Sequence, residues 1–237
     1  MLTIRSLGHA CYTLHDGTHC VILDPFLEGN PDAVCGPDEV QVDFILPTHG
    51  HADHLGDAVR ISKAQAAPIV GVYELCAYCA RQGAQTVPMH IGGQRQMPFG
   101  TIKLTPAVHG SAVISDDTIQ YMGLACGFVV TMGQATVYFA GDTALFGDMA
   151  LISRSHKLDV AILPIGDNFT MGIEDAAQAT ALLKPDTVIP THYNAFEAIR
   201  RDAGVFAQRV GALSEATAGA QCRILDPGEE FIVSDGP

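Results

Sequence analysis

This 237-residue sequence lacks any long hydrophobic segment. Its apolar runs are short and interrupted, and none approaches the ~20 residues that a helix needs to cross a bilayer. The opening stretch MLTIRSLGHA has neither an apolar core nor a cleavage site of small residues, so it is predicted to form a first strand rather than a signal peptide. We therefore expect a cytoplasmic protein that has no membrane partner.

Basic residues are also scarce in this chain. It has 13 lysines and arginines against 26 aspartates and glutamates, which gives a formal net charge of −13. A surface this acidic repels phosphate backbones, so nucleic acid is not an expected partner. The composition directs attention to small molecules, and it leaves open whether the chain forms a homo-oligomer.

No stretch of the sequence has the composition of a linker. The length fits one large domain, and the hydrophobic share of 48% is sufficient for a full core. We therefore expect a single domain over residues 1–237. The seven cysteines are odd in number and scattered, so free thiols are expected. Cys76 and Cys79 form a lone C-x-x-C pair, and a structural zinc site would need a second pair.

Short strands dominate the first part of the chain, and strands alternate with helices later. Strands are predicted at 2–7, 11–15, 20–23, 44–46, 69–72, 101–108, 121–131, 136–140, 160–163, 187–189, 223–225 and 230–233, and helices at 56–66, 73–82, 145–155, 174–183 and 196–213. This order indicates an α/β fold in which two sheets pack together with helices on the outside.

Two apolar strands, one in each half of the chain, run into the same tripeptide. Residues 44–49 read Phe-Ile-Leu-Pro-Thr-His, and residues 188–192 read Val-Ile-Pro-Thr-His. A buried strand that ends in a histidine places the imidazole at the edge of its sheet. We therefore expect the two halves to direct His49 and His192 at one shared site.

The segment that follows the first of these strands is the most informative in the sequence. It has the pattern H-x-H-x-D-H, formed by His49, His51, Asp53 and His54. Neutral imidazole and carboxylate are good ligands for zinc, manganese and iron. A single ion cannot easily take four groups from a loop this tight, whereas two neighbouring ions can.

Three further candidate ligands each follow a predicted strand. His109 comes after residues 103–108, Asp142 after 137–141, and His192 after the second Pro-Thr pair. A lone histidine is usually a core or surface residue, and Asp142 could cap the helix that follows it. The repetition of the strand-then-ligand order favours a common metal site instead.

These motifs resemble those of the metallo-β-lactamase superfamily, in the same order across nearly the whole chain. The resemblance lies closest to the uncharacterised metal-dependent hydrolases related to ascorbate-6-phosphate lactonase, through residues 7–11, 49–57, 104–109, 138–149, 163–172 and 190–194. It implies a four-layer αββα sandwich and two divalent ions, zinc first, with manganese or iron as alternatives. It assigns His49, His51 and His109 to the first ion. It assigns Asp53, His54 and His192 to the second ion, and Asp142 as the ligand that bridges the two.

The resemblance also implies a chemistry. A hydroxide that bridges the ions would cleave an ester, lactone or phosphodiester bond of a small-molecule substrate. Asp53 is assigned a catalytic role, orienting the water or accepting its proton, in addition to binding metal. His9 is a candidate catalytic or substrate-binding residue, or else a structural histidine. Asn168 is a candidate substrate-binding residue, or else a turn asparagine.

Two supporting features and three alternatives complete this interpretation. Asp24, at the end of a strand, could orient a ligand histidine or cap a turn. The loops at 28–38 and 113–120 are expected to shape the substrate pocket. A redox di-iron protein on the same fold would replace a histidine of the H-x-H-x-D-H motif with an acidic residue. A nuclease would add basic surface, and a non-catalytic metal-binding protein remains an alternative.

Overall fold

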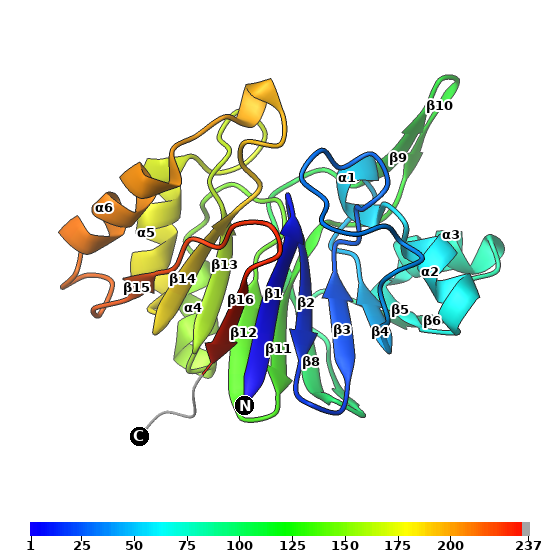
Figure 1. The fold of residues 1–237 in the computed structure, drawn as a ribbon, viewed down its shortest axis with the longest axis horizontal. Helices are drawn as coiled ribbons and strands as arrows, with labels where there is room; N and C mark the ends of the chain where they lie inside the picture. Colours follow the sequence, from blue (N-terminus) through cyan, green and yellow to red (C-terminus); the bar gives the residue numbers. More distant parts are fainter. Residues whose placement is uncertain (234–237) are drawn as a thin grey trace.

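Two seven-stranded sheets form the centre of the computed structural model, which describes residues 1–233 (Figure 1). The first sheet has the strand order β16 (Glu230–Val233), β1 (Leu2–Gly8), β2 (Cys11–His15), β3 (Cys20–Leu23), β4 (Phe44–Leu46), β5 (Ile69–Val72) and β6 (Thr86–Met89). The second has the order β15 (Gln221–Cys222), β14 (Thr187–Thr191), β13 (Val160–Pro164), β12 (Ala135–Phe139), β11 (Cys126–Met132), β8 (Gly100–Pro106) and β7 (Gln94–Met97).

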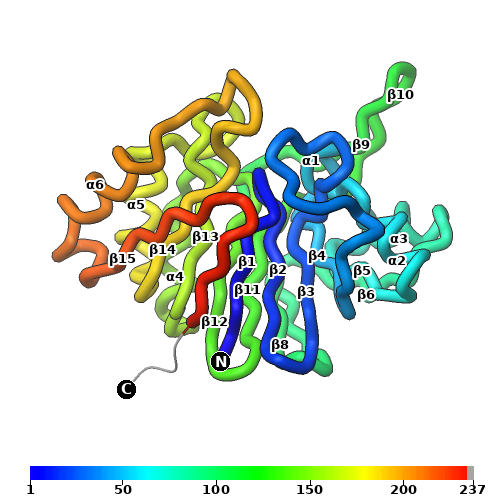
Figure 2. Tube along the Cα trace, in the orientation of Figure 1, coloured from blue at the N-terminus to red at the C-terminus, as the bar shows by residue number. Residues whose placement is uncertain are grey.

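Each sheet has an antiparallel half and a parallel half. In the first sheet the pairs from β16 to β3 are antiparallel and those from β3 to β6 are parallel. In the second sheet the pairs from β7 to β12 are antiparallel and those from β12 to β15 are parallel. The two sheets therefore repeat one design, as the shared Pro-Thr-His sequence predicts. Figure 2 shows the first strand of the chain, β1, beside the last described strand, β16.

Helices cover the outer face of each sheet. On the first sheet lie α1 (Ala52–Leu55), α2 (Ala58–Gln65) and α3 (Tyr73–Arg81), and on the second lie α4 (Met149–Ser155), α5 (Ile173–Leu183) and α6 (Ala203–Ala212). The central core contains side chains from both sheets, such as Leu14 and Phe128, while separate apolar clusters lie beneath the two sets of helices. The predicted four-layer αββα sandwich is confirmed. Within residues 1–233, no helix is long and apolar enough to span a bilayer.

Some predicted elements have different limits. The predicted strand at 121–131 begins only at Cys126, where the ladder with β8 starts opposite Pro106 and the Cys126 N–H donates to the carbonyl of Thr48. The preceding residues form a separate hairpin of β9 (Ala112–Ser115) and β10 (Thr118–Tyr121), which projects from the sandwich (Figure 1). The helix predicted over 196–213 is interrupted. A 3-10 turn, η1 (Glu197–Ile199), precedes α6. Asp202 caps the start of α6, because its side chain accepts a hydrogen bond from the N–H of Gly204.

The C-x-x-C pair lies in α3, and its thiols are inert in this environment. Cys76 and Cys79 are both buried, and all seven cysteines are free. Burial raises the pKa of each of these two thiols to about 12. Because the thiolate is the reactive and metal-binding form, this pair is unsuited to redox or metal chemistry.

Candidate metal centre

The ends of three parallel strands bring most of the candidate ligands to one edge of the sandwich. His49 follows β4, Asp142 follows β12, and His192 directly follows β14. In the first sheet the chain then turns through His51 into the one-turn helix α1, which carries Asp53 and His54. Because parallel strands end at the same edge, residues nearly 150 positions apart meet there.

The first group of candidate ligands is made of histidines alone. His49, His51 and His109 each offer a ring nitrogen, and the three atoms lie within 4.8 Å of one another. Nε2 of His49 is 2.9 Å from Nδ1 of His51. His49 is fully buried, while His51 and His109 are partly exposed. The structure thus brings together the three residues predicted to hold one ion.

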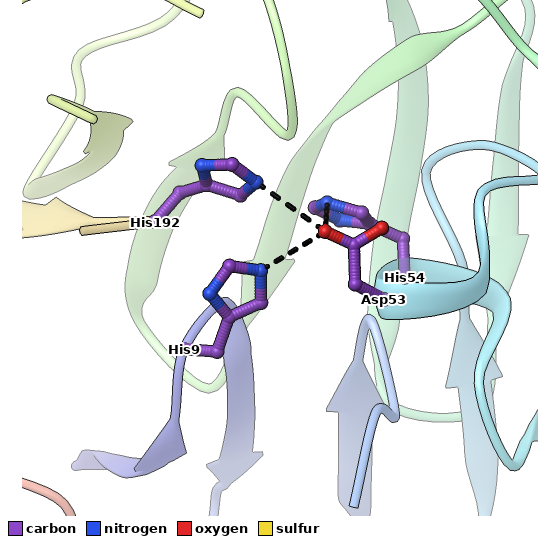
Figure 3. A group of neighbouring side chains, drawn as sticks. All are labelled: His9, Asp53, His54 and His192. Carbon is purple, nitrogen blue, oxygen red and sulfur yellow. Dashed lines mark hydrogen bonds and ion pairs between the residues drawn. The ribbon is translucent and has the colours of Figure 1, made fainter. Parts of the chain in front are cut away.

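The second group contains Asp53, His54 and His192, together with His9 (Figure 3). Their ligand atoms also lie within 4.8 Å of one another. Oδ2 of Asp53 is 3.3 Å from Nε2 of His9 and 3.7 Å from Nε2 of both His54 and His192. His9 lies in the turn between β1 and β2, so both sheets and α1 contribute to this group. The three residues predicted for the second ion are adjacent, and His9 is a fourth neighbour.

Asp142 lies between the two groups. Its Oδ2 is 3.3 Å from Nε2 of His54, 3.2 Å from Nε2 of His192 and 3.5 Å from Nε2 of His109. Its carboxylate therefore contacts side chains of both groups, which is the position that a bridging ligand requires.

A buried carboxylate orients one histidine from each group. Oδ2 of Asp24 accepts a hydrogen bond from Nδ1 of His54 at 2.7 Å and another from the hydroxyl of Thr48 at 2.9 Å. The Thr48 hydroxyl oxygen in turn lies 2.9 Å from Nδ1 of His49. This arrangement fixes the tautomer of both rings so that each Nε2 is left for a ligand. The orienting role anticipated for Asp24 is therefore present in the structure, and Thr48 extends it.

The polar atoms of this centre fit divalent cations. Nε2 of His54, Nε2 of His192 and Oδ1 of Asp142 are buried and form no hydrogen bond within the described chain. Buried polar atoms normally form a hydrogen bond, so several that form none at a single point call for an explanation. Imidazole nitrogens and carboxylate oxygens that converge within 4.8 Å are a donor set suited to zinc, manganese or iron.

In the second group, the neighbouring carboxylates favour the protonated form of the histidines, and these protons compete with metal ions. Burial alone would lower the pKa of His192, but the adjacent Asp142 carboxylate outweighs it and raises that pKa to about 9. Asp142 and Asp24 likewise raise the pKa of His54 well above its usual value against the effect of burial. In the first group, burial and the neighbouring His54 lower the pKa of His49. Protons therefore compete with metal mainly in the second group.

Metal loading is expected to release protons near neutral pH. The raised pKa values of His192 and His54 keep both rings protonated at neutral pH, so metal binding must displace about two protons. The apparent metal affinity should therefore fall as the pH decreases. Calorimetric titrations at pH 7.5 in buffers of different ionisation enthalpy measure this release. A binding enthalpy that is identical in every buffer would contradict the proton competition.

Three residues of the centre have strained backbone. The φ angles of His9, Asp24 and His192 are 53°, 42° and 54°. Non-glycine residues seldom adopt this left-handed region, and such strain is concentrated at functional sites. The surrounding sheets therefore hold these side chains in an arrangement that the local sequence alone would not favour.

A pocket of about 370 Å³ opens beside the centre, within the size range of small-molecule sites. Its lining consists of five candidate ligands and four apolar residues: His51, Asp53, His109, Asp142 and His192; and Ala52, Ala112, Ile114 and Phe169. The loop at 113–120 shapes this pocket through Ile114, as expected. The loop at 28–38 contributes no lining residue.

The two candidates for substrate contact lie outside this lining. The side chain of His9 is fully buried and directed at Asp53 (Figure 3). Asn168 is exposed with a φ of 46°, as turn asparagines often are, and its neighbour Phe169 lines the pocket instead. Sequence reasoning missed Phe169 and Ile114 as wall residues. The available signal was an apolar residue in a polar loop close to a ligand.

Comparisons with known proteins agree with this geometry. A family profile described as a beta-lactamase superfamily domain matches residues 19–193, a range that contains all seven predicted ligands. A UPF0173 metal-dependent hydrolase of Pelotomaculum thermopropionicum is 49% identical over 231 residues, covering 97% of this chain and 99% of the relative. Another, of Desulfitobacterium hafniense, is 46% identical over 236 residues, covering 98% and 99%.

A solved structure supports the same assignment. Igni18, described as a novel metallo hydrolase from the archaeon Ignicoccus hospitalis, has a TM-score of 0.86 and 33% identity, with 97% of each chain covered. The predicted resemblance is confirmed by sequence and by fold. This chain therefore belongs to the metallo-β-lactamase superfamily, as one of its metal-dependent hydrolases.

Proposed function

We propose that this enzyme holds two divalent ions in the centre and hydrolyses an ester, lactone or phosphodiester bond of a small molecule. The observation that carries the proposal is the position of Asp142, whose Oδ2 lies within 3.5 Å of histidines from both groups. We further propose that residues 1–237 act as one hydrolase domain in the cytoplasm, a reducing compartment that suits seven free cysteines.

The ligand assignment follows the two groups. His49, His51 and His109 would hold one ion, Asp53, His54 and His192 the other, and Asp142 both. When bound, such ions polarise the substrate and lower the pKa of water toward neutrality. Zinc suits this donor set, and manganese and iron are the alternatives.

Asp53 is the residue best placed to act on water. It lines the pocket, and its side chain is 31% exposed. Burial opposes ionisation, but His192 and His9 outweigh it and hold the pKa of Asp53 well below its usual value. The lowered pKa keeps Asp53 ionised, and because Oδ2 is engaged by His9, Oδ1 is the oxygen that can accept a hydrogen bond from a water and orient it.

His9 fits a positioning role better than contact with substrate. Its Nε2 fixes Oδ2 of Asp53 at 3.3 Å, and the ring packs against Phe196 with centroids 5.5 Å apart. A fully buried side chain cannot meet a molecule in the pocket, yet it can set the direction of the carboxylate. We propose that His9 acts through Asp53.

Metal content tests the proposal directly. Purified wild-type protein, reconstituted with zinc, manganese or iron, should hold about two ions per chain by elemental analysis. His51→Ala should hold fewer, because it removes one ligand of the first group. His90→Ala, which changes an exposed histidine outside the centre, should match the wild type. Turnover is then assayed on esters, lactones and phosphodiesters with the metal found. A protein that takes up no metal under any condition would refute the mechanism.

A further inference from the structure

The pocket beside the metal centre has a second wall that takes no part in holding ions. This wall is apolar and comes from three separate places in the fold. Ala52 belongs to α1, Ala112 and Ile114 belong to β9, and Phe169 lies in the loop after β13. A substrate that reached the centre would therefore meet both the carboxylates and imidazoles of the centre and the hydrocarbon of this wall.

The larger members of this wall are left in contact with water. Ile114 is 66% exposed and Phe169 is 60% exposed. Val108, which directly precedes His109, and Phe196, whose ring packs against His9, are exposed as well. Of these four residues, Ile114 and Phe169 line the pocket, and exposed apolar residues there mark a binding surface, because covering them with a ligand releases free energy.

Positive side chains are missing from the lining of this pocket. None of its nine lining residues is a lysine or an arginine, and its acidic members are Asp53 and Asp142. Arg201, which approaches the Phe169 loop, is held by Asp167 through an ion pair of 2.9 Å and lines a different pocket. Proteins usually bind a phosphate or carboxylate group with such cations. An anionic group remote from the scissile bond would find no partner here.

We propose that the substrate carries an uncharged apolar group beside the bond that is cleaved, and that Ile114 and Phe169 bind this group. This inference rests on the proposed hydrolase function and narrows its substrate class. An acyl chain of several carbons fits the volume, since 370 Å³ equals the space of about a dozen water molecules at ~30 Å³ each.

A matched series of phenyl esters tests the inference on the metal-loaded enzyme. From acetate to butyrate to hexanoate, kcat/KM should rise about fourfold for each added methylene that the wall covers. The monophenyl ester of succinic acid has the same number of acyl carbons as the butyrate, with a carboxylate in place of the terminal methyl group. We expect this charged ester to be at least ~10-fold poorer than the butyrate.

Variants of the wall locate the preference. Ile114→Ala and Phe169→Ala should lower kcat/KM for the hexanoate by about 10-fold and leave the acetate within about twofold. Ile119→Ala is the matched control. Ile119 pairs with Ile114 across the hairpin and is 77% exposed, but it does not line the pocket. Equal effects of Ile114→Ala and Ile119→Ala would show that the hairpin acts as a whole, and would overturn the role of the wall.

Binding measured without turnover separates this inference from the function on which it rests. Hexananilide and acetanilide are amide counterparts of the esters, and calorimetry should show tighter binding of hexananilide to metal-free protein, with the difference lost in Phe169→Ala. Selective binding without cleavage of any ester would reject the ester chemistry and support the apolar wall. Cleavage that is indifferent to chain length or to the succinate charge, with no selectivity in binding, would reject the wall and support the hydrolase.

Discussion

Replacing Asp142 with asparagine should abolish most of the metal content and the turnover of this enzyme together. The asparagine keeps the shape of the side chain but removes the charge that lies within 3.5 Å of His54, His109 and His192. Changing a residue that only hydrogen-bonds to a metal ligand already lowers metal affinity or activity ~10- to 100-fold. For a ligand common to both ions we expect a loss of at least ~100-fold in kcat/KM and fewer than two ions per chain.

Elemental analysis and initial rates on the same preparation measure this effect. The matched control is Asp148→Asn, an exposed carboxylate six residues further along the same loop, which should retain metal and rate. The Asp142→Asn variant should also release fewer protons on metal loading, because Asp142 is the main group that raises the pKa of His192. An Asp142→Asn protein with two ions and an unchanged rate would rule out the bridging role.

Replacing Asp24 with asparagine should weaken both the fold and the metal site. Asp24 has no exposed surface, and it accepts hydrogen bonds from the Thr48 N–H, the Thr48 hydroxyl and His54 Nδ1. Asparagine tolerates the positive φ of 42°, so the change tests the charge rather than the backbone. Breaking a buried charged network in this way costs about 3–5 kcal/mol of unfolding free energy. Metal affinity should fall ~10- to 100-fold, because His49 and His54 lose their orientation.

Chemical unfolding of the metal-free protein and competition with a chelator measure the two effects separately. Asp43→Asn is the control, because Asp43 also accepts a backbone hydrogen bond, from Cys20, but at the surface. Its cost should be about 1 kcal/mol or less, with metal affinity unchanged. If Asp24→Asn lost no more stability and no more affinity than this control, the orienting network would have no role.

The candidate ligands could be predicted because each one leaves a local mark in the sequence. The H-x-H-x-D-H pattern is dense, and the repeated Pro-Thr-His after an apolar strand identifies His49 and His192 as equivalent positions in the two sheets. The meeting of the two groups follows from the sheet topology, because parallel strands end at one edge. The contact of Asp142 with both groups was implied only by the family resemblance, because it depends on how the sheets are stacked and leaves no local mark.

The individual wall residues of the pocket could not be predicted, although the sequence indicated the segment 113–120 that contains Ile114. Ile114 and Phe169 belong to a projecting hairpin and to a loop, and neither has the periodicity that marks a core position. Asn168 was predicted to bind substrate because it is polar and follows an apolar strand. It has a positive φ and does not line the pocket, whereas the next residue, Phe169, does. The interruption before α6 also escaped prediction. Apolar residues at helical spacing lie on both sides of residues 200–202, as Ile199 and Ala203 do, but the backbone of 200–202 is not helical.

The spread of the ligands along the chain has a consequence for synthesis at the ribosome. Translation supplies the histidines of the first group by residue 109, the carboxylate proposed as the bridge at residue 142 and the last member of the second group only at residue 192. The edge of β1 likewise stays open until β16, the last strand described, is made and pairs with it. Under the proposed assignment, a growing chain therefore passes through a stage that has the three histidines proposed for one ion and lacks the last ligand proposed for the other. The order in which the ribosome releases the sequence would then set which of the two proposed sites can be completed first.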